Sequence, residues 1–203
     1  QFPQDVFAIQ QIILSTKPDL IIETGIAHGG SLISSASMLA LLDYCDSTKS
    51  KNLEINRMVL GIDIDIRDHN KKEILDHDLA HKIKMIEGSS IDSSIMNEVF
   101  DYSSNFKKKL VILDSNHTYD HVIKELEIYA PLVSIDSYCI VCDTAIADMP
   151  NIFHENREWN TINNPKKAVR EFLSENKDFE SDIDIDNRLL ISSNPEGYIK
   201  RIK

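Results

Sequence analysis

Cysteines and basic residues are scarce in this chain, and it has no long apolar run. Only three cysteines occur among 203 residues, which argues against a disulfide-stapled secreted domain. No apolar run reaches the length of about eighteen residues that a membrane span needs. The net charge of −11 disfavours nucleic acid or an anionic membrane as the main partner. No signal-peptide pattern opens the sequence, so we expect a cytoplasmic protein.

The rest of the composition is ordinary for a globular domain. Hydrophobic residues make up 42% and charged residues 27% of the chain, which is typical of water-soluble folds. A chain of this length can bury a full core. We therefore expect one main domain over residues 18–203, preceded by a helix in residues 1–17 that could mediate homo-oligomer formation. A small polar molecule fits this composition better as a ligand than a nucleic acid does.

Short apolar runs alternate with segments of helical periodicity, which predicts a doubly wound parallel sheet with helices on both faces. The predicted parallel strands are Leu20–Glu23, Met58–Asp63, Lys84–Gly88, Leu110–Asp114 and Tyr138–Asp143. The predicted helices are Phe2–Ser15, Ser31–Leu42, Asp68–His81, Asp92–Tyr102, Tyr119–Ala130 and Pro165–Glu175. Arg188–Ser192 and Tyr198–Ile202 flank a Pro/Gly turn and are predicted to close the sheet as an antiparallel hairpin. Asp43–Arg57 and Ala145–Asn164 are predicted as an exposed connection and an irregular segment.

The stretch Ile21–Ser31, I-I-E-T-G-I-A-H-G-G-S, joins the first strand to the first helix of the sheet. Its glycines allow a tight turn and a close approach to a ligand. The helix start that follows offers unpaired N–H groups and a positive dipole end. Ala27 interrupts the dinucleotide fingerprint G-x-G-x-x-G. By itself the pattern fits a cofactor loop and a plain tight turn equally well.

Four of the predicted strands end in an acid: Glu23, Asp63, Asp114 and Asp143. Each acid alone fits a loop start or a helix cap. The carboxyl ends of parallel strands border the ligand crevice of such a sheet, so the four acids together predict a site. The acid after the second strand binds ribose hydroxyls in dinucleotide folds, which makes Asp63 the candidate for that contact.

The segment L-D-S-N-H after the fourth strand and D-T after the fifth predict a metal site. Asp114 and Asp143, with Thr144 beside them, offer oxygen ligands of the kind that hard cations prefer. His117 lies one short turn after Asp114 and could take a proton from a substrate. The alternative for His117 is a helix N-terminal residue bonded to a neighbour.

Two further patterns resemble metal motifs but lack their geometry. Cys139 and Cys142 are three residues apart on a strand, so their side chains should point to opposite faces. Asp182, Asp184 and Asp186 resemble the start of a calcium loop, but the required glycine and bidentate glutamate are missing. We therefore interpret this second segment as a solvated acidic turn.

Several blocks together resemble the cephalosporin hydroxylase/rhamnosyl O-methyltransferase family, over nearly the whole chain from Pro18 onward. The blocks are I-I-E-T-G-I-A-H-G-G-S, G-I-D-I-D, E-G-S-S-I-D, L-D-S-N-H-T-Y-D-H-V, E-L-E-I-Y-A-P-L-V, V-C-D-T, N-N-P-K-K-A-V-R-E-F-L and N-R-L-L-I-S-S-N-P-E-G-Y-I-K-R. The resemblance implies the fold of S-adenosylmethionine-dependent methyltransferases, a seven-stranded sheet with an antiparallel last strand.

The resemblance also implies roles for particular residues. The cofactor's methionine part would lie against the glycine turn, at Glu23, Thr24, Gly25, His28, Gly29, Gly30 and Ser31. Asp63 would take the ribose, and the segment from Gly88 to Asp92 would lie along the adenine, with Ser89 as the first contact. The implied magnesium ligands are Asp114 and Asp143, with Thr144 beside them.

The chain departs from the family pattern at two positions. Cys142 stands where family members can carry an acid before the fifth-strand aspartate, and a thiol is a poor ligand for a hard cation. His117 stands where similar catechol O-methyltransferases have a lysine, and an imidazole can accept a proton near neutral pH. No motif for a two-His-one-carboxylate iron site is visible.

The resulting hypothesis is magnesium-assisted O-methyl transfer from S-adenosylmethionine to a hydroxyl, on a sugar or on a polysaccharide or antibiotic precursor. Asp114 and His117 would be the catalytic residues. Arg157 and Trp159 would cover the acceptor, although Trp159 could equally anchor its loop to the core. The alternatives are a nucleotide-dependent oxidoreductase or hydroxylase and a non-catalytic domain that keeps the cofactor fold.

Overall fold

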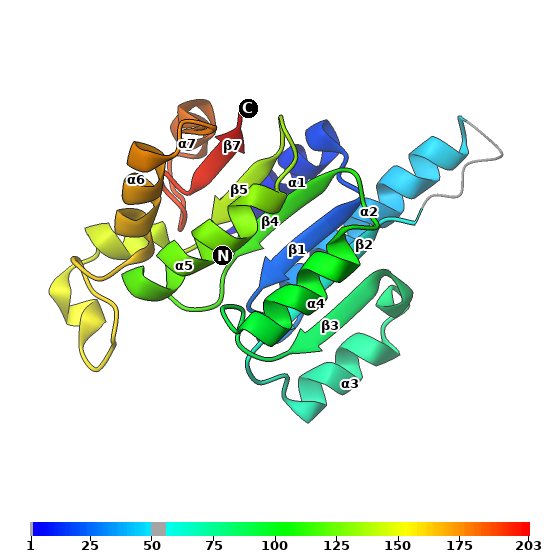
Figure 1. The fold of residues 1–203 in the computed structure, drawn as a ribbon, viewed down its shortest axis with the longest axis horizontal. Coiled ribbons are helices and arrows are strands. Elements are labelled where there is room, and N and C mark those ends of the chain that lie inside the picture. Colours follow the sequence, from blue (N-terminus) through cyan, green and yellow to red (C-terminus); the bar gives the residue numbers. More distant parts are fainter. Residues whose placement is uncertain (1, 50–55) are drawn as a thin grey trace.

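The computed structural model describes residues 2–49 and 56–203, which form one mixed sheet between two layers of helices (Figure 1). The strands are β1 (Leu20–Thr24), β2 (Met58–Asp63), β3 (Ile83–Glu87), β4 (Lys109–Leu113), β5 (Tyr138–Val141), β6 (Phe179–Ser181) and β7 (Tyr198–Arg201). The α-helices are α1 (Pro3–Thr16), α2 (Gly30–Ser47), α3 (Asp68–Asp76), α4 (Ser93–Ser103), α5 (Tyr119–Tyr129), α6 (Pro165–Glu175) and α7 (Ile183–Leu189). Short 3₁₀ turns are η1 (Ala80–Lys82), η2 (Ala130–Leu132), η3 (Thr144–Asp148) and η4 (Asn151–His154).

The order of the strands across the sheet is β3-β2-β1-β4-β5-β7-β6. The strands β1 to β5 pair in parallel, while β7 runs antiparallel to both β5 and β6. The order reverses between β1 and β4, which is where ligands bind in doubly wound sheets. The prediction of a seven-stranded sheet with an antiparallel last strand is confirmed.

Successive side chains of each strand point to opposite faces of the sheet, and this divides the hydrophobic core into two layers. On β1, Ile21 packs in the core layer under α1, α2, α3 and α7, whereas Leu20 and Ile22 pack in the layer under α4, α5 and α6. Successive side chains of a strand point to opposite faces, so a strand that is apolar throughout needs helices on both faces. In Figure 1, α4 and α5 lie in front of the sheet, while α1 and α2 lie behind it.

The predicted closing hairpin is wrong in its first strand. Arg188 lies in α7, and the residues after it leave the helix through Leu190, which has a φ of 58° and is 92% exposed. On the side away from β5, the strand that pairs with β7 is β6, which forms the edge of the sheet. The run L-L-I, residues 189–191, is therefore not a buried strand, because α7 covers the core at that edge of the sheet.

The acidic segment D-I-D-I-D begins a helix rather than a solvated turn. The side chain of Asp182 accepts a hydrogen bond from the backbone N–H of Ile185 and so caps α7. Ile185 is buried in the core beneath the helix. Aspartate is a preferred N-cap residue, which explains why three aspartates at this spacing can start a helix.

Most other elements lie within a few residues of their predicted bounds, but the helix predicted over Asp68–His81 ends at Asp76, and a separate turn, η1, follows it. The first connection differs, because α2 continues to Ser47, into the predicted Asp43–Arg57 segment. Residues 50–55 of that prediction lie outside the described residues.

Cys139 and Cys142 lie in opposite core layers, as their spacing predicts. Within residues 2–49 and 56–203, no helix is long and apolar enough to cross a membrane.

Candidate active site

The glycine turn after β1 is held against the end of β4. Gly25 has a φ of 91°, and a Cβ at this position would lie 2.0 Å from the backbone oxygen of Asp114. Its N–H donates to the carbonyl of Ile62 on β2. Glycine is needed here both for the backbone conformation and for the close approach. The turn therefore sits directly over the ends of β2 and β4.

Asp63 fixes the shape of this turn. One of its carboxylate oxygens accepts hydrogen bonds from the backbone N–H groups of Ile26 and Ala27, at 2.7 and 3.0 Å. The other oxygen accepts from the N–H of Asp65 at 3.1 Å. The side chain also lines a cavity at this edge of the sheet. The structure shows that Asp63 holds the glycine turn. Its contact with ribose stays a prediction.

Glu23 lies fully buried beneath the same turn. Its carboxyl group accepts a hydrogen bond from the hydroxyl of Ser31 in the first turn of α2. Burial raises the pKa of Glu23 to about 8, although the Ser31 hydrogen bond lowers it; the nearby charge of Asp114 adds to the increase. Desolvation of a carboxylate favours its protonated form. Glu23 therefore connects β1 to α2 through a hydrogen bond, and its pKa depends on the charge of Asp114.

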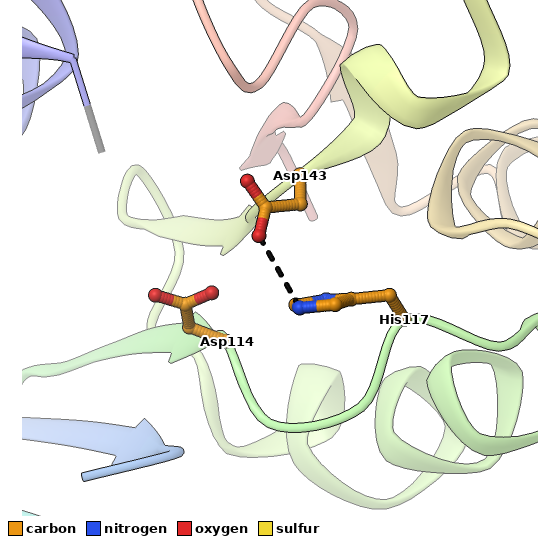
Figure 2. A group of neighbouring side chains, drawn as sticks. All are labelled: Asp114, His117 and Asp143. Atoms are coloured by element: carbon orange, nitrogen blue, oxygen red, sulfur yellow. Dashed lines mark ion pairs between the residues drawn. The ribbon is translucent and has the colours of Figure 1, made fainter. Parts of the chain in front are cut away.

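Three side chains of metal-ligand type meet at the ends of β4 and β5 (Figure 2). Asp114 follows β4, His117 lies in the loop after it, and Asp143 follows β5. Each offers a ligand atom, and these atoms lie within 4.8 Å of one another. The Nε2 atom of His117 is 3.3 Å from a carboxylate oxygen of Asp143. The structure therefore brings together the three residues that the sequence suggests for metal binding and proton transfer.

Asp143 is held by a loop from the far end of the chain. Its φ is 56°, and its backbone N–H donates to the side-chain oxygen of the buried Asn194 at 2.9 Å. The hydroxyl of Thr144 is buried and donates to the carbonyl of Pro195 at 2.7 Å. The geometry thus gives Thr144 a structural role in the same loop contact, and its predicted role as a metal ligand stays a prediction.

The irregular segment after β5 covers His117. The indole of Trp159 contacts the His117 ring edge-on, with centroids 6.1 Å apart, and contacts His154 in the same way at 5.6 Å. The guanidinium of Arg157 lies 5.4 Å from the indole centroid. Trp159 is half-buried. It therefore both anchors the segment and leaves part of an aromatic surface beside the cluster.

Two cavities lie on either side of the glycine turn. The larger, which we call the α1 cavity, measures about 500 Å³ and lies between α1 and the start of α2. The smaller, which we call the β3 cavity, measures about 130 Å³ and lies between the ends of β2, β3 and β4. Together they outline a path along the carboxyl edge of the sheet for an extended ligand.

The predicted site residues divide between these cavities. Those that line the α1 cavity are His28, Gly30, Ser31 and Asp114. Those that line the β3 cavity are Gly25, Asp63 and Ser89. Lining neither cavity are Glu23, Thr24, Gly29, Asp92, His117, Asp143 and Thr144. Among the residues that the structure describes, no side chain caps the first turn of α2, so its N–H groups can donate hydrogen bonds to an anionic ligand.

A polar network behind the β3 cavity is not among the predicted site residues. Glu125 of α5 accepts hydrogen bonds from the hydroxyls of Ser90 and Ser115, and His121 lies one helical turn before it. The i,i+4 spacing of His121 and Glu125 is the one signal in the sequence, because it places both on one face of a helix. The contacts with the two serines join separate loops and have no local signature.

Comparison with known proteins identifies relatives of the whole chain. The model of the rhamnosyl O-methyltransferase/CmcI family matches residues 1–202. A rhamnosyl O-methyltransferase of Mycobacterium tuberculosis (strain ATCC 25618 / H37Rv) is 25% identical over 201 residues, covering 97% of this chain and 73% of that protein. The protein of that name from Mycobacterium leprae is 24% identical over 147 residues, which is 72% of this chain and 57% of that protein.

Solved structures confirm the fold. The structure described as "cmcI-D160 Mg-SAM" has a TM-score of 0.62 at 17% identity, covering all of this chain and 72% of that one. The apo structure of CalS11, a TDP-rhamnose 3'-O-methyltransferase, has a TM-score of 0.52 at 17% identity, covering 82% and 67%. The resemblance seen in the sequence is confirmed by the family match: this chain belongs to the rhamnosyl O-methyltransferase/CmcI family.

Proposed function

We propose that this protein transfers the methyl group of S-adenosylmethionine to a hydroxyl group of a sugar, with the assistance of Mg²⁺. The observation that carries the proposal is the cluster of Asp114, His117 and Asp143 beside the glycine turn. Such a cluster at the carboxyl edge of a doubly wound sheet places metal and proton chemistry next to a cofactor loop. Membership in an O-methyltransferase family supports the same reaction.

The two cavities suit the two ends of S-adenosylmethionine. The α1 cavity has the open N-terminus of α2 at its wall, which suits the carboxylate of the methionine part. The β3 cavity has Asp63 and Ser89 at its wall, which suit the nucleoside part. Gly25 lines the β3 cavity, and its missing side chain lets the turn pack directly against the backbone of Asp114. The relative described as "cmcI-D160 Mg-SAM" has the same fold.

The donor set of the cluster fits a divalent cation. Asp114 and Asp143 supply carboxylate oxygens, the ligand type that Mg²⁺ prefers. A bound Mg²⁺ supplies Lewis acidity, which lowers the pKa of an acceptor hydroxyl and orients it. Cys142 points into the core and leaves the set with two carboxylates. We therefore propose that water and the acceptor complete the coordination.

His117 is placed to take the proton from the acceptor. Its Nε2 atom faces the carboxylate of Asp143, which would orient the ring and stabilise an imidazolium, as a carboxylate does for histidine in other enzymes. The half-buried Trp159 packs against the ring and limits its movement. The methyl transfer itself then depends on holding the acceptor oxygen in line with the cofactor, where proximity supplies much of the acceleration.

The acceptor is proposed to bind under the segment that carries Arg157 and Trp159. An exposed guanidinium stacked on an indole gives a flat surface with hydrogen-bond donors, and such surfaces suit a sugar ring and its hydroxyls. Relatives of this chain carry names that refer to rhamnosyl groups. A rhamnose glycoside, or a polysaccharide or antibiotic precursor that contains one, is therefore the acceptor class we propose.

Transfer of an isotope-labelled methyl group from S-adenosylmethionine to a panel of rhamnose glycosides tests the proposal. We expect labelled product with Mg²⁺ and loss of the product when EDTA removes the metal. Product that does not depend on divalent metal would contradict the role of the cluster. Binding of NAD in place of S-adenosylmethionine would favour an oxidoreductase, and cofactor binding without transfer to any acceptor would favour a non-catalytic domain.

We also propose a homo-oligomer in the cytoplasm. The exposed face of α1 carries several large apolar side chains: Phe2, Val6, Phe7 and Leu14. Neighbouring exposed apolar side chains commonly mark an interaction surface. Within the described residues, no disulfide joins Cys45, Cys139 or Cys142, which suits a reducing compartment.

A further inference from the structure

A buried carboxylate lies behind the β3 cavity. The side chain of Glu125 is 0% exposed, and its Oε1 atom accepts hydrogen bonds from Ser90 Oγ at 2.6 Å and Ser115 Oγ at 2.7 Å. Within the described part of the chain, its Oε2 atom has no hydrogen-bond partner. Both serines line the cavity, whereas Glu125 does not. A buried carboxylate thus holds two hydroxyl groups that a ligand can touch.

This arrangement fixes the direction of both hydroxyl groups. A carboxylate only accepts hydrogen bonds, so Ser90 and Ser115 must direct their protons toward Glu125. Their oxygen lone pairs are then what the cavity presents. The Nε2 atom of His121 lies 3.1 Å from Ser90 Oγ and 3.3 Å from Ser115 Oγ. An N–H of His121 can occupy one lone pair of a serine and still leave acceptor capacity toward the cavity.

The position of the network relates it to the base of the cofactor. Asp63 and Ser89 line the same cavity, and the acid after the second strand of such a sheet binds the ribose. The base then lies beyond the ribose, where Ser90 and Ser115 are. Adenine carries an amino group, which donates hydrogen bonds, whereas hypoxanthine carries a carbonyl oxygen at that position and only accepts there.

We propose that Glu125 selects the amino-substituted purine of the cofactor by holding Ser90 and Ser115 as hydrogen-bond acceptors. Glu125 is a positioning residue, and the two serines contact the base. The proposal rests on the proposed function, because it takes the β3 cavity as the nucleoside end of the S-adenosylmethionine site. A carbonyl oxygen facing two acceptor oxygens would lose its hydrogen bond and be repelled, which weakens binding by about 10–100-fold.

Calorimetry with two ligands tests the proposal. The first ligand is S-adenosylhomocysteine, and the second is S-inosylhomocysteine, in which a carbonyl oxygen replaces the amino group of the purine. We expect the wild-type protein to bind the first about 10–100-fold more tightly. In Glu125→Gln, the amide N–H₂ can donate to a serine and free its hydroxyl proton for the cavity, so the preference should fall by about tenfold.

Two further variants make the test specific. Glu127→Gln removes the same charge from an exposed position of α5 and should keep the wild-type preference. Ser115→Ala changes an exposed residue, so it should fold even where Glu125→Gln does not, and it should also reduce the preference.

Equal binding of both ligands by the wild type would overturn the inference while leaving the proposed function intact. An unchanged preference in Glu125→Gln and Ser115→Ala would overturn it as well. Failure of the wild type to bind either ligand at millimolar concentration would overturn the proposed function and this inference with it.

Discussion

Asp114 connects the three parts of the site at the scale of single residues. Its backbone oxygen packs against Gly25, its charge contributes to the raised pKa of Glu23, and its carboxylate belongs to the cluster with His117 and Asp143. Such a residue is predictable from the sequence because acids at the ends of parallel strands meet at one edge of a sheet. Glu125 is not predictable in this way, because it acquires its partners only when α5 packs beside two loops.

Replacement of Asp114 tests the metal site. Asp114→Asn keeps the size of the side chain but removes a charged ligand, so we expect methyl transfer to fall at least about 100-fold. Binding of S-adenosylhomocysteine should change by less than about tenfold, because most of the cofactor contacts lie elsewhere. Kinetics and calorimetry on the same preparation measure both effects.

Asp120→Asn is the matched control for this variant, since Asp120 is exposed in the first turn of α5. It should leave both quantities near the wild-type values. Full activity of Asp114→Asn would rule out Asp114 as a required ligand.

The buried Glu23 predicts a pH dependence of stability. Its pKa is raised from 4.5 to about 8 in the folded protein, so the folded state keeps a proton that the unfolded chain has released. The contribution of Glu23 is therefore fully present below pH 4.5 and is lost as the pH rises to about 8. Each pH unit in this window should lower the free energy of unfolding by about 1 kcal/mol.

Denaturant unfolding of the wild type and of Glu23→Gln across this pH range isolates the effect. The variant carries no titrating group at this position, so the difference in unfolding free energy between the two proteins should decrease from acid to pH 8. A difference that is constant with pH would show that Glu23 does not titrate in this window.

At the scale of elements, periodicity and burial decide what the sequence reveals. The parallel strands and the helices α1, α5 and α6 have long or clearly apolar patterns, and the structure places them close to their predicted bounds. The strand β6 has three residues, F-E-S, and is too short to show any alternation. It exists because β7 provides a partner strand, which is a tertiary effect that local sequence does not contain.

Hydrogen bonds to Asp5 anchor α1 to the C-terminal part of the chain, and we expect the protein to lose stability when they are removed. Asp5 is buried and accepts hydrogen bonds from Ser192 Oγ at 2.5 Å, from Tyr198 OH at 2.7 Å and from the backbone N–H of Ser193 at 2.9 Å. Asp5→Ala would leave the buried Tyr198 hydroxyl and the half-buried serine donors without this acceptor, which should lower the free energy of unfolding by about 2–4 kcal/mol.

Chemical denaturation measures this loss, with Gln4→Ala on the exposed side of α1 as the control. The control should change stability by less than about 0.5 kcal/mol. Equal stability of the two variants would mean that the Asp5 contacts do not anchor the helix.

At the scale of the whole molecule, the topology brings distant segments to one edge of the sheet. The glycine turn, the loop after β4 and the residues after β5 come from three separate parts of the chain and meet where the strand order reverses. The sequence predicts this meeting, because the fold class dictates it. The division of the edge into two cavities depends on how α1 packs against α2, which the sequence does not specify.

The exposed face of α1 predicts self-association. Phe7 is 56% exposed and lies on a helix with other exposed apolar side chains. We expect sedimentation to give a mass of at least two chains for the wild type and of one chain for Phe7→Asp, because a buried, unpaired charge disfavours an apolar interface. Asn97→Asp adds the same charge at an exposed position of α4, on the opposite face of the sheet, and should keep the wild-type mass. A monomeric wild type would contradict the prediction.

Calorimetry with S-adenosylmethionine is the most direct measurement of the central claim, that this fold is a cofactor site for methyl transfer. We expect saturable binding with one site per chain. Asp63→Ala should weaken binding by at least about tenfold, because Asp63 both holds the glycine turn and lines the β3 cavity. Absence of binding by the folded wild-type protein at millimolar cofactor would show that this edge of the sheet is not an S-adenosylmethionine site.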